Sequence, residues 1–319
     1  MRRVLTLIAL LTACVASAQT YPTKPIRLVV GFAPGGAADI IARTMSDPLT
    51  RALGQGVIVD NRPGAGSSLA AEYMAKAAPD GYTIMIASQS GMIINPIVNK
   101  NISYDTERDF VAITQVTSSP LVVAVHPSLP VKSIRELIAE AKKNPGKLNF
   151  ATSGNGSLPH LATALFDALA GIEMVHIPYK SGGLSVQSVL VGDTHVTFAT
   201  SPSVMPLVQA GRLRGLAVTT RVRSPLIAGL PGMEEAGLAN YGLSIWYGFF
   251  APAGTPREIV KRLFDATVQT LQDARLKEIL ARDGTETAAS RSPEEFAAFL
   301  REDARVIARV IRETGAKFD

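Results

Sequence analysis

Cysteine is nearly absent from this chain, because only one of its 319 residues, Cys14, is a cysteine. The chain after Cys14 therefore has no disulfide and no thiol chemistry. Aromatic residues are also few, at 6%, and charged residues make up 18%, whereas 47% of the sequence is hydrophobic. Cores of alanine, valine, leucine and isoleucine suit α/β layers, and the length suffices for two domains of ordinary size.

Common catalytic and nucleotide-binding motifs are missing as well. The sequence contains no G-x-S-x-G, H-E-x-x-H, Walker or G-x-G-x-x-G motif. The four histidines are too far apart in sequence to form a local metal motif, so we expect neither a metal nor a cofactor; they are His126, His160, His176 and His195. The net charge of +5 is scattered, without a run of lysines and arginines. This pattern argues against nucleic acid as a partner.

Long apolar runs are confined to the N-terminus, since no later run approaches the roughly 20 residues that a membrane helix needs. Two arginines follow the initiator methionine, Val4–Leu11 is apolar apart from one threonine, and Ala16-Ser17-Ala18 resembles a cleavage site. This pattern predicts a secretory signal peptide over residues 1–18. Leu11–Cys14 also resembles a bacterial lipobox, and in that alternative Cys14 would carry a lipid anchor.

A glycine-rich turn between a predicted strand and a predicted helix is the central local signal. The apolar strand Ile26–Val30 is followed by Pro34-Gly35-Gly36, and an amphipathic helix begins near Asp39. Unpaired backbone N–H groups at the start of a helix carry partial positive charge, and glycine leaves them open to a ligand. The turn therefore predicts an anion site, the alternative being a turn that binds nothing.

A second loop has the same design. Two glycines and several hydroxyl residues within Thr152–His160 separate a short strand, Leu148–Ala151, from a helix over Leu161–Ala170. Neither loop contains lysine or arginine, so an anion held there would be bound by backbone N–H groups and hydroxyls. We interpret the two loops as two halves of a clamp, one in each predicted domain.

Polar residues also follow two other predicted strands. Ser88 and Gln89 follow the third strand of the first domain, and Thr200 and Ser201 follow a strand of the second domain. Ligands of open α/β sheets lie outside the carboxyl ends of the strands. We therefore expect these residues to face the same crevice as the glycine loops, the alternative being solvated loops.

The order of the predicted elements favours two domains joined by two crossings. Alternating strands and helices over residues 26–87 predict a parallel sheet covered on both faces, although Pro48 is expected to kink or split the first helix. Two extended runs, Phe110–Val116 and Leu121–Val125, lead into the second domain, and Gly242–Pro252 leads back.

Helices are predicted in both the middle and the end of the chain. Ser133, followed three residues later by Glu136, predicts a capped helix over Val131–Lys143. Charged residues at helical spacing predict surface helices after the return crossing, over residues 256–274, 276–282 and 293–314.

Five segments together carry a family resemblance. They are Pro25–Gly36, Asp60–Gly66, Pro79–Thr83, Gly154–Ser157 and Phe250–Pro256. Over essentially all of the chain after the signal peptide, the sequence resembles the Bug-type extracytoplasmic solute receptors of tripartite tricarboxylate transporters. The proline within the first helix departs from the usual family pattern, which bears on helix straightness rather than on the site.

This resemblance implies a type 2 periplasmic-binding-protein fold, an α/β architecture of two Rossmann-like lobes with a hinge of two crossings. Lobe 1 would comprise residues 19–120 plus 222–319, and lobe 2 residues 121–221. The implied location is the periplasm, and the implied activity is not enzymatic. The receptor would capture a small carboxylate, such as a di- or tricarboxylate, an acidic amino acid or an aromatic acid. It would deliver this ligand to the membrane subunits of a tripartite transporter, or serve a sensor kinase instead, and we expect a monomer.

The resemblance also implies that the two glycine loops grip a ligand carboxylate, partly through ordered waters. The loop residues implicated are Phe32, Ala33, Pro34, Gly35, Gly36, Asp39, Ser153, Gly154, Asn155, Gly156 and Ser157. Further candidates are Ser88, Gln89, Thr200 and Ser201. His160 is a candidate because it lies one turn into the second loop's helix, where it could orient Ser157 or touch the ligand.

An exported hydrolase or isomerase is the alternative function. Ser157 and His160 are three residues apart at the start of a helix, a spacing that could bring a nucleophile close to a base. No orienting acid or oxyanion arrangement is visible beside them, so we favour the receptor.

Overall fold

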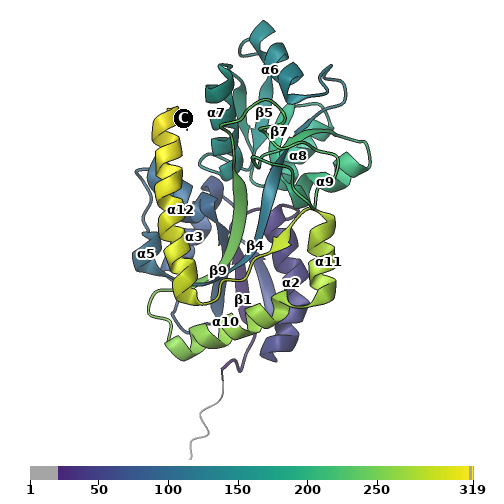
Figure 1. Ribbon diagram of the computed structural model, residues 1–319. Coiled ribbons are helices and arrows are strands. Elements are labelled where there is room, and N and C mark those ends of the chain that lie inside the picture. Colours follow the sequence, from purple (N-terminus) through teal and green to yellow (C-terminus); the bar gives the residue numbers. More distant parts are fainter. Residues whose placement is uncertain (1–20, 316–317, 319) are drawn as a thin grey trace, which may run out of the picture.

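The computed structural model of the protein describes residues 21–315 and Phe318 (Figure 1). The predicted signal peptide, its cleavage site and the lipobox with Cys14 lie outside the described residues. Among the described helices, none is both long and apolar enough to cross a membrane.

The first lobe begins with three strands that pair in parallel, as predicted. Their order in the sheet is β2-β1-β3. Short helices follow the third strand and lead to the hinge. The elements are β1 (Ile26–Val30), α2 (Ala37–Leu53), β2 (Val57–Asn61), η2 (Ala65–Ser67), α3 (Ser68–Ala75), β3 (Thr83–Ser88), η3 (Ser90–Ile94), α4 (Asn95–Val98) and α5 (Thr106–Asp109).

Pro48 does not split the first helix into two pieces, because α2 runs unbroken through it. That part of the prediction is wrong. Met45 and Leu49, on either side of the proline, are fully buried and lie on one face of the helix with Ile41 and Leu53. Burial of this continuous apolar face outweighs the single backbone hydrogen bond that proline removes.

Two long strands form the hinge: β4 (Phe110–Val125) and β9 (Ser244–Pro252). Residues 110–120 of β4 pair antiparallel with β9, whereas residues 121–125 pair with strands of the second lobe. The two extended runs predicted here are therefore one strand, because the polar segment between them continues the ladder with β9. The two crossings are confirmed. The first sheet is mixed rather than purely parallel, since β9 also pairs antiparallel with β3.

The second lobe repeats the alternation of strands and helices around the far half of β4. Ser133 caps α6 as predicted, because its hydroxyl accepts a hydrogen bond from the Glu136 N–H. The elements are α6 (Ile134–Lys143), β5 (Asn149–Thr152), α7 (Leu158–Ala170), β6 (Val175–Pro178), α8 (Gly182–Leu190), β7 (Val196–Thr200), α9 (Ser201–Gln209) and β8 (Arg214–Val218).

The hinge strand separates two apolar cores in the second lobe. Leu121 and Val123 of β4 face the large core that extends through both lobes, while Val122 and Ala124 face a smaller core beneath α8 and α9. This alternation follows from the two-residue repeat of a strand and fixes which face each helix covers.

The C-terminal part returns to the first lobe and then crosses the hinge. Its elements are α10 (Arg257–Leu271), α11 (Ala274–Arg282), β10 (Glu286–Thr287) and α12 (Pro293–Thr314). Helix α12 packs along β4 and reaches α7 of the second lobe (Figure 1). Trp246 of β9 is buried under this helix, where its indole N–H donates to Asp303 at 2.7 Å.

Candidate functional site

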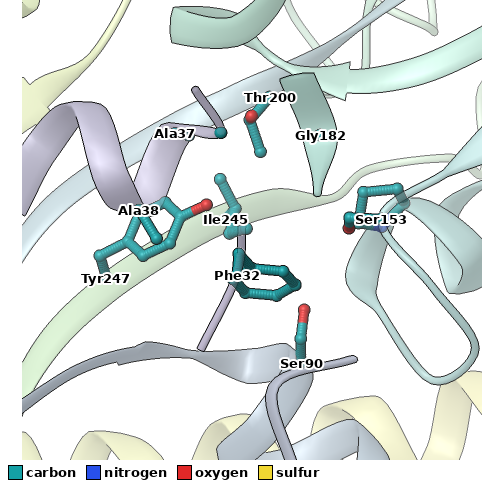
Figure 2. A pocket seen from close by; sticks show the side chains of 11 residues that line it. Phe32, Ala37, Ala38, Ser90, Ser153, Gly182, Thr200, Ile245 and Tyr247 are labelled. Atoms are coloured by element: carbon teal, nitrogen blue, oxygen red, sulfur yellow. The ribbon is translucent and has the colours of Figure 1, made fainter. Parts of the chain in front are cut away.

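A small cavity lies between the lobes, at the carboxyl ends of their parallel strands. It holds about 330 Å³ of space free of atoms, part of which is open to solvent. Both lobes and the hinge strand β9 contribute to its wall (Figure 2), through Phe32, Gly36, Ala37, Ala38, Ser90, Ser153, Pro159, Gly182, Thr200, Ile245 and Tyr247. None of these side chains carries a charge.

Four helices direct their N-termini at this cavity: α2 of the first lobe and α7, α8 and α9 of the second. The N-cap of α2 is Gly36, which has no side chain, and Thr200 at the N-cap of α9 makes no capping hydrogen bond. Ser157 and Ser181, in contrast, cap α7 and α8 with their hydroxyls. The free N–H groups and dipoles of α2 and α9 therefore create positive potential in a site without a cation.

Asp39 shapes the first glycine turn from outside the cavity. Its carboxylate accepts hydrogen bonds from the Gly35 N–H (3.0 Å), from Nε of Arg43 (2.9 Å) and from Nδ2 of Asn61 (2.9 Å). Asn61 Nδ2 also donates to the Phe32 carbonyl at 3.0 Å. Burial by itself raises the pKa of Asp39, but these hydrogen bonds and the charge of Arg43 outweigh it and hold the pKa below its usual value. The ionised carboxylate thus fixes the turn.

The two lobes touch each other beside the cavity. The Ala33 N–H donates to the Lys180 carbonyl at 3.1 Å, and the Leu158 N–H donates to the Ser90 hydroxyl at 3.0 Å. The first bond joins the two glycine loops 33–36 and 180–183, and the second joins η3 to the N-terminus of α7. The described conformation is therefore closed, which explains why the cavity is so small.

Most of the second glycine loop, Gly154–Ser157, serves this lobe-to-lobe contact. A Cβ atom at Gly66 would lie 2.5 Å from the Asn155 carbonyl oxygen, and one at Gly156 would lie 2.3 Å from Oδ1 of Asn95. Asn95 and the turn containing Gly66 belong to the first lobe. Glycine is therefore required in this loop for close approach of the lobes, and only the preceding Ser153 lines the cavity.

The structure brings four of the predicted ligand contacts to the cavity wall, namely Phe32, Gly36, Ser153 and Thr200. The remaining predicted contacts do not line it: Ala33, Pro34, Gly35, Asp39, Ser88, Gln89, Gly154, Asn155, Gly156, Ser157, His160 and Ser201. Several of these residues hold the loops in place from behind the cavity wall, as Asp39 does.

Gln89 and Ser201 bond to neighbouring segments of the chain. Gln89 Nε2 donates to the Ser244 carbonyl and its Oε1 accepts from the Trp246 N–H, both at 3.0 Å, which fastens the end of β3 to β9. The Ser201 hydroxyl donates to a carbonyl of the loop after α11 at 3.3 Å. Ser88 is buried, and its hydroxyl has no partner among residues 21–315 and Phe318.

His160 points away from the cavity, into the interior of the second lobe. Its ring stacks on His176 with centroids 3.8 Å apart, and Phe318 contacts it edge-on at 5.0 Å. The Ser157 hydroxyl accepts from the backbone N–H of His160, whereas Nδ1 of the ring has no partner within the described chain. The hydrogen bond between Ser157 and the imidazole that the enzyme alternative needs is therefore not formed.

The buried histidine pair predicts a loss of stability in acid. Burial lowers the pKa of His160, helped by the charge of His176, to about 3, and burial lowers that of His176 to about 4. Unfolded histidine titrates near pH 6.5, so the unfolded chain binds more protons and the free energy of unfolding falls as the pH drops from about 6.5 to 4. Burial raises the pKa of Asp167 to about 7, so this carboxyl binds its proton more readily in the folded chain and opposes the trend. It contributes one proton, whereas the two histidines contribute two.

His160→Phe is expected to flatten this pH dependence, because phenylalanine fills the same stack and takes up no proton. The loss of unfolding free energy between pH 6.5 and 4.5 should shrink by about 1–2 kcal/mol in urea titrations. His126→Phe, in the loop after β4, is the matched control. An unchanged slope in His160→Phe would contradict the prediction.

Seven cavity residues are not among the predicted contacts: Ala37, Ala38, Ser90, Pro159, Gly182, Ile245 and Tyr247. Gly182 had a visible signal, since Ser181-Gly182-Gly183 repeats the glycine turn at the start of a helix. Ile245 and Tyr247 had none, because apolar residues of a strand reveal neither which face they occupy nor what that face covers.

Comparison with known proteins identifies relatives along the whole chain. The family profile described as "Tripartite tricarboxylate transporter family receptor" matches residues 41–316. Protein BugT of Bordetella pertussis is 35% identical over 306 residues, which cover 96% of this chain and 94% of BugT.

Two solved structures of similar proteins contain a ligand. R. palustris Rpa4515 with adipate is 34% identical, with a TM-score of 0.89 and coverage of 92% of this chain and 98% of that one. MatC from Rhodopseudomonas palustris with bound malate is 26% identical, with a TM-score of 0.88 and coverage of 91% and 100%. The chain belongs to the tripartite tricarboxylate transporter receptor family, the Bug-type periplasmic solute-binding proteins.

Proposed function

We propose that this protein captures a small carboxylate between its two lobes and delivers it to the membrane subunits of a tripartite tricarboxylate transporter. The ligand carboxylate lies against the uncapped N-termini of α2 and α9, in contact with Phe32, Gly36, Ser153 and Thr200. The relatives with adipate and malate support a carboxylate as the ligand class.

The observation that carries this proposal is the convergence of helix N-termini on a cavity without a charged side chain. Such a site attracts an anion through backbone N–H groups and dipoles. It also avoids the cost of taking an arginine or lysine out of water when the lobes close.

We further propose that closure occurs about the hinge strands, with residues 19–120 plus 222–319 moving as one lobe and 121–221 as the other. The change of partner of β4 between Pro120 and Leu121 supports the boundary between residues 120 and 121. A ligand that contacts both lobes stabilises the closed state through contacts it lacks in the open state.

Carboxylates are expected to stabilise the mature chain, residues 19–319, whereas their primary amides are not. An acid at about 100 times its dissociation constant should add about 2.7 kcal/mol to the free energy of unfolding, which a thermal-shift assay detects. Trp246, the single tryptophan, gives a second readout because its neighbours Ile245 and Tyr247 line the cavity. Equal stabilisation by acids and amides would contradict an anion site.

A further inference from the structure

The hydroxyl of Tyr247 is a hydrogen-bond donor that no described residue satisfies. Strand β9 alternates at the floor of the cavity, so Ile245 and Tyr247 face it while Trp246 faces α12. Tyr247 is 4% exposed, and Figure 2 shows its hydroxyl directed toward the space between the lobes. Within residues 21–315 and Phe318, no hydrogen bond reaches this hydroxyl.

The hydroxyl of Tyr247 opens onto the cavity and has no acceptor among the described residues. Burial raises the pKa of Tyr247 further above its usual value, so the group stays protonated and acts as a neutral donor. A neutral donor on the cavity wall is available to an oxygen atom of a bound ligand. Closure of the lobes is therefore favoured by a ligand that brings an acceptor oxygen to this point.

In the proposed function, the ligand's carboxylate already occupies the N-termini of α2 and α9. Gly36, Ala37 and Ala38 of α2 and Thr200 of α9 supply backbone groups at helix N-termini, whereas Tyr247 lies on the hinge strand and belongs to no helix. The direct contacts between the lobes also limit the length of the ligand tail that the closed state can enclose.

We propose that Tyr247 is a specificity-determining residue whose hydroxyl donates to a second oxygen-bearing group of the ligand. The site thereby prefers compact carboxylic acids with a second carboxylate, hydroxyl or carbonyl group over simple alkanoic acids of the same length. This assignment rests on the proposed carboxylate-binding function and adds the group that reads the other end of the ligand.

The test compares Tyr247→Phe with the wild type, using succinate, L-malate and butyrate as probes in titration calorimetry and tryptophan fluorescence. The wild type should bind succinate or L-malate at least about tenfold more tightly than butyrate, since a hydrogen bond to a charged acceptor is worth that factor or more. In Tyr247→Phe this preference should fall to about threefold or less, with butyrate affinity unchanged. Tyr73→Phe, which removes the same atom outside the cavity, should keep the preference.

The stability of ligand-free Tyr247→Phe distinguishes a role in ligand binding from a purely structural role. Because Tyr247→Phe removes a hydroxyl that bonds to no described residue, its unfolding temperature without ligand should stay close to that of the wild type. Equal weakening of all three acids by Tyr247→Phe, or no change in any, would overturn the assignment and leave the proposed function intact. Failure of the wild type to bind any carboxylate would overturn both.

Discussion

Gly183→Ala is expected to weaken carboxylate binding by about 10- to 100-fold, the cost of forcing one extra carbon into a packed contact. Gly183 lies in the first turn of α8 with ordinary helical backbone angles, so alanine causes no strain within its own lobe. Its Cβ atom, however, would lie 2.5 Å from the carbonyl oxygen of Gly35 across the cleft. The substitution should therefore act on closure alone, and titration calorimetry with a bound acid would measure it.

Gly56→Ala is the matched control, because the nearest atom to its new Cβ would be 4.0 Å away and its backbone angles are also ordinary. The free energy of unfolding of Gly183→Ala without ligand should be unchanged or slightly higher, since alanine stabilises a helix relative to glycine. Wild-type affinity in Gly183→Ala would show that the ligand-bound lobes stand further apart at this contact than the described ones.

Asp39→Ala is expected to lower the free energy of unfolding by about 3 kcal/mol and to reduce ligand binding below detection. The substitution leaves the Gly35 N–H, the Asn61 amide and the Arg43 guanidinium without their shared acceptor. Loss of several hydrogen bonds to one nearly buried carboxylate falls in the upper range of single-residue effects. Because the turn it fixes forms the N-terminus of α2, the anion site should be lost with it.

Urea denaturation and calorimetry of Asp39→Ala measure the two effects separately. Asp265→Ala is the control, since Asp265 pairs with Lys261 on the exposed face of α10 and such pairs contribute little. Asp39→Asn, which keeps one acceptor oxygen, should fall between the wild type and alanine. Normal ligand affinity in Asp39→Ala would show that the turn holds its shape without the carboxylate.

Several elements could be predicted from the sequence because their causes are local. The parallel pairing of the first three strands follows from alternating apolar strands and helices, and the Ser133 cap follows from a hydroxyl placed three residues before a glutamate. Pro48 shows the limit of local rules, because burial of the apolar face on both sides of it keeps α2 intact.

The candidate site could be predicted only in part. Phe32, Gly36, Ser153 and Thr200 lie at the ends of strands or in the turns after them, and residues in that position meet at one edge of a sheet whatever the details of packing. His160 was assigned to the ligand from its place at the start of a helix, but sequence spacing does not say which way a ring turns. The stack with His176 depends on a strand fifteen residues further along the chain.

The sequence by itself determined where helix N-termini follow glycine turns and present backbone N–H groups, because these are properties of neighbouring residues. Only the tertiary structure decided which of those groups share a cavity. The order of strands places β9 at the floor between the lobes, and this position turns Tyr247 from an ordinary core residue into a donor facing the ligand space. The local sequence pattern does not show which strands pair when they lie far apart in the chain, because any apolar strand fits beside another equally well.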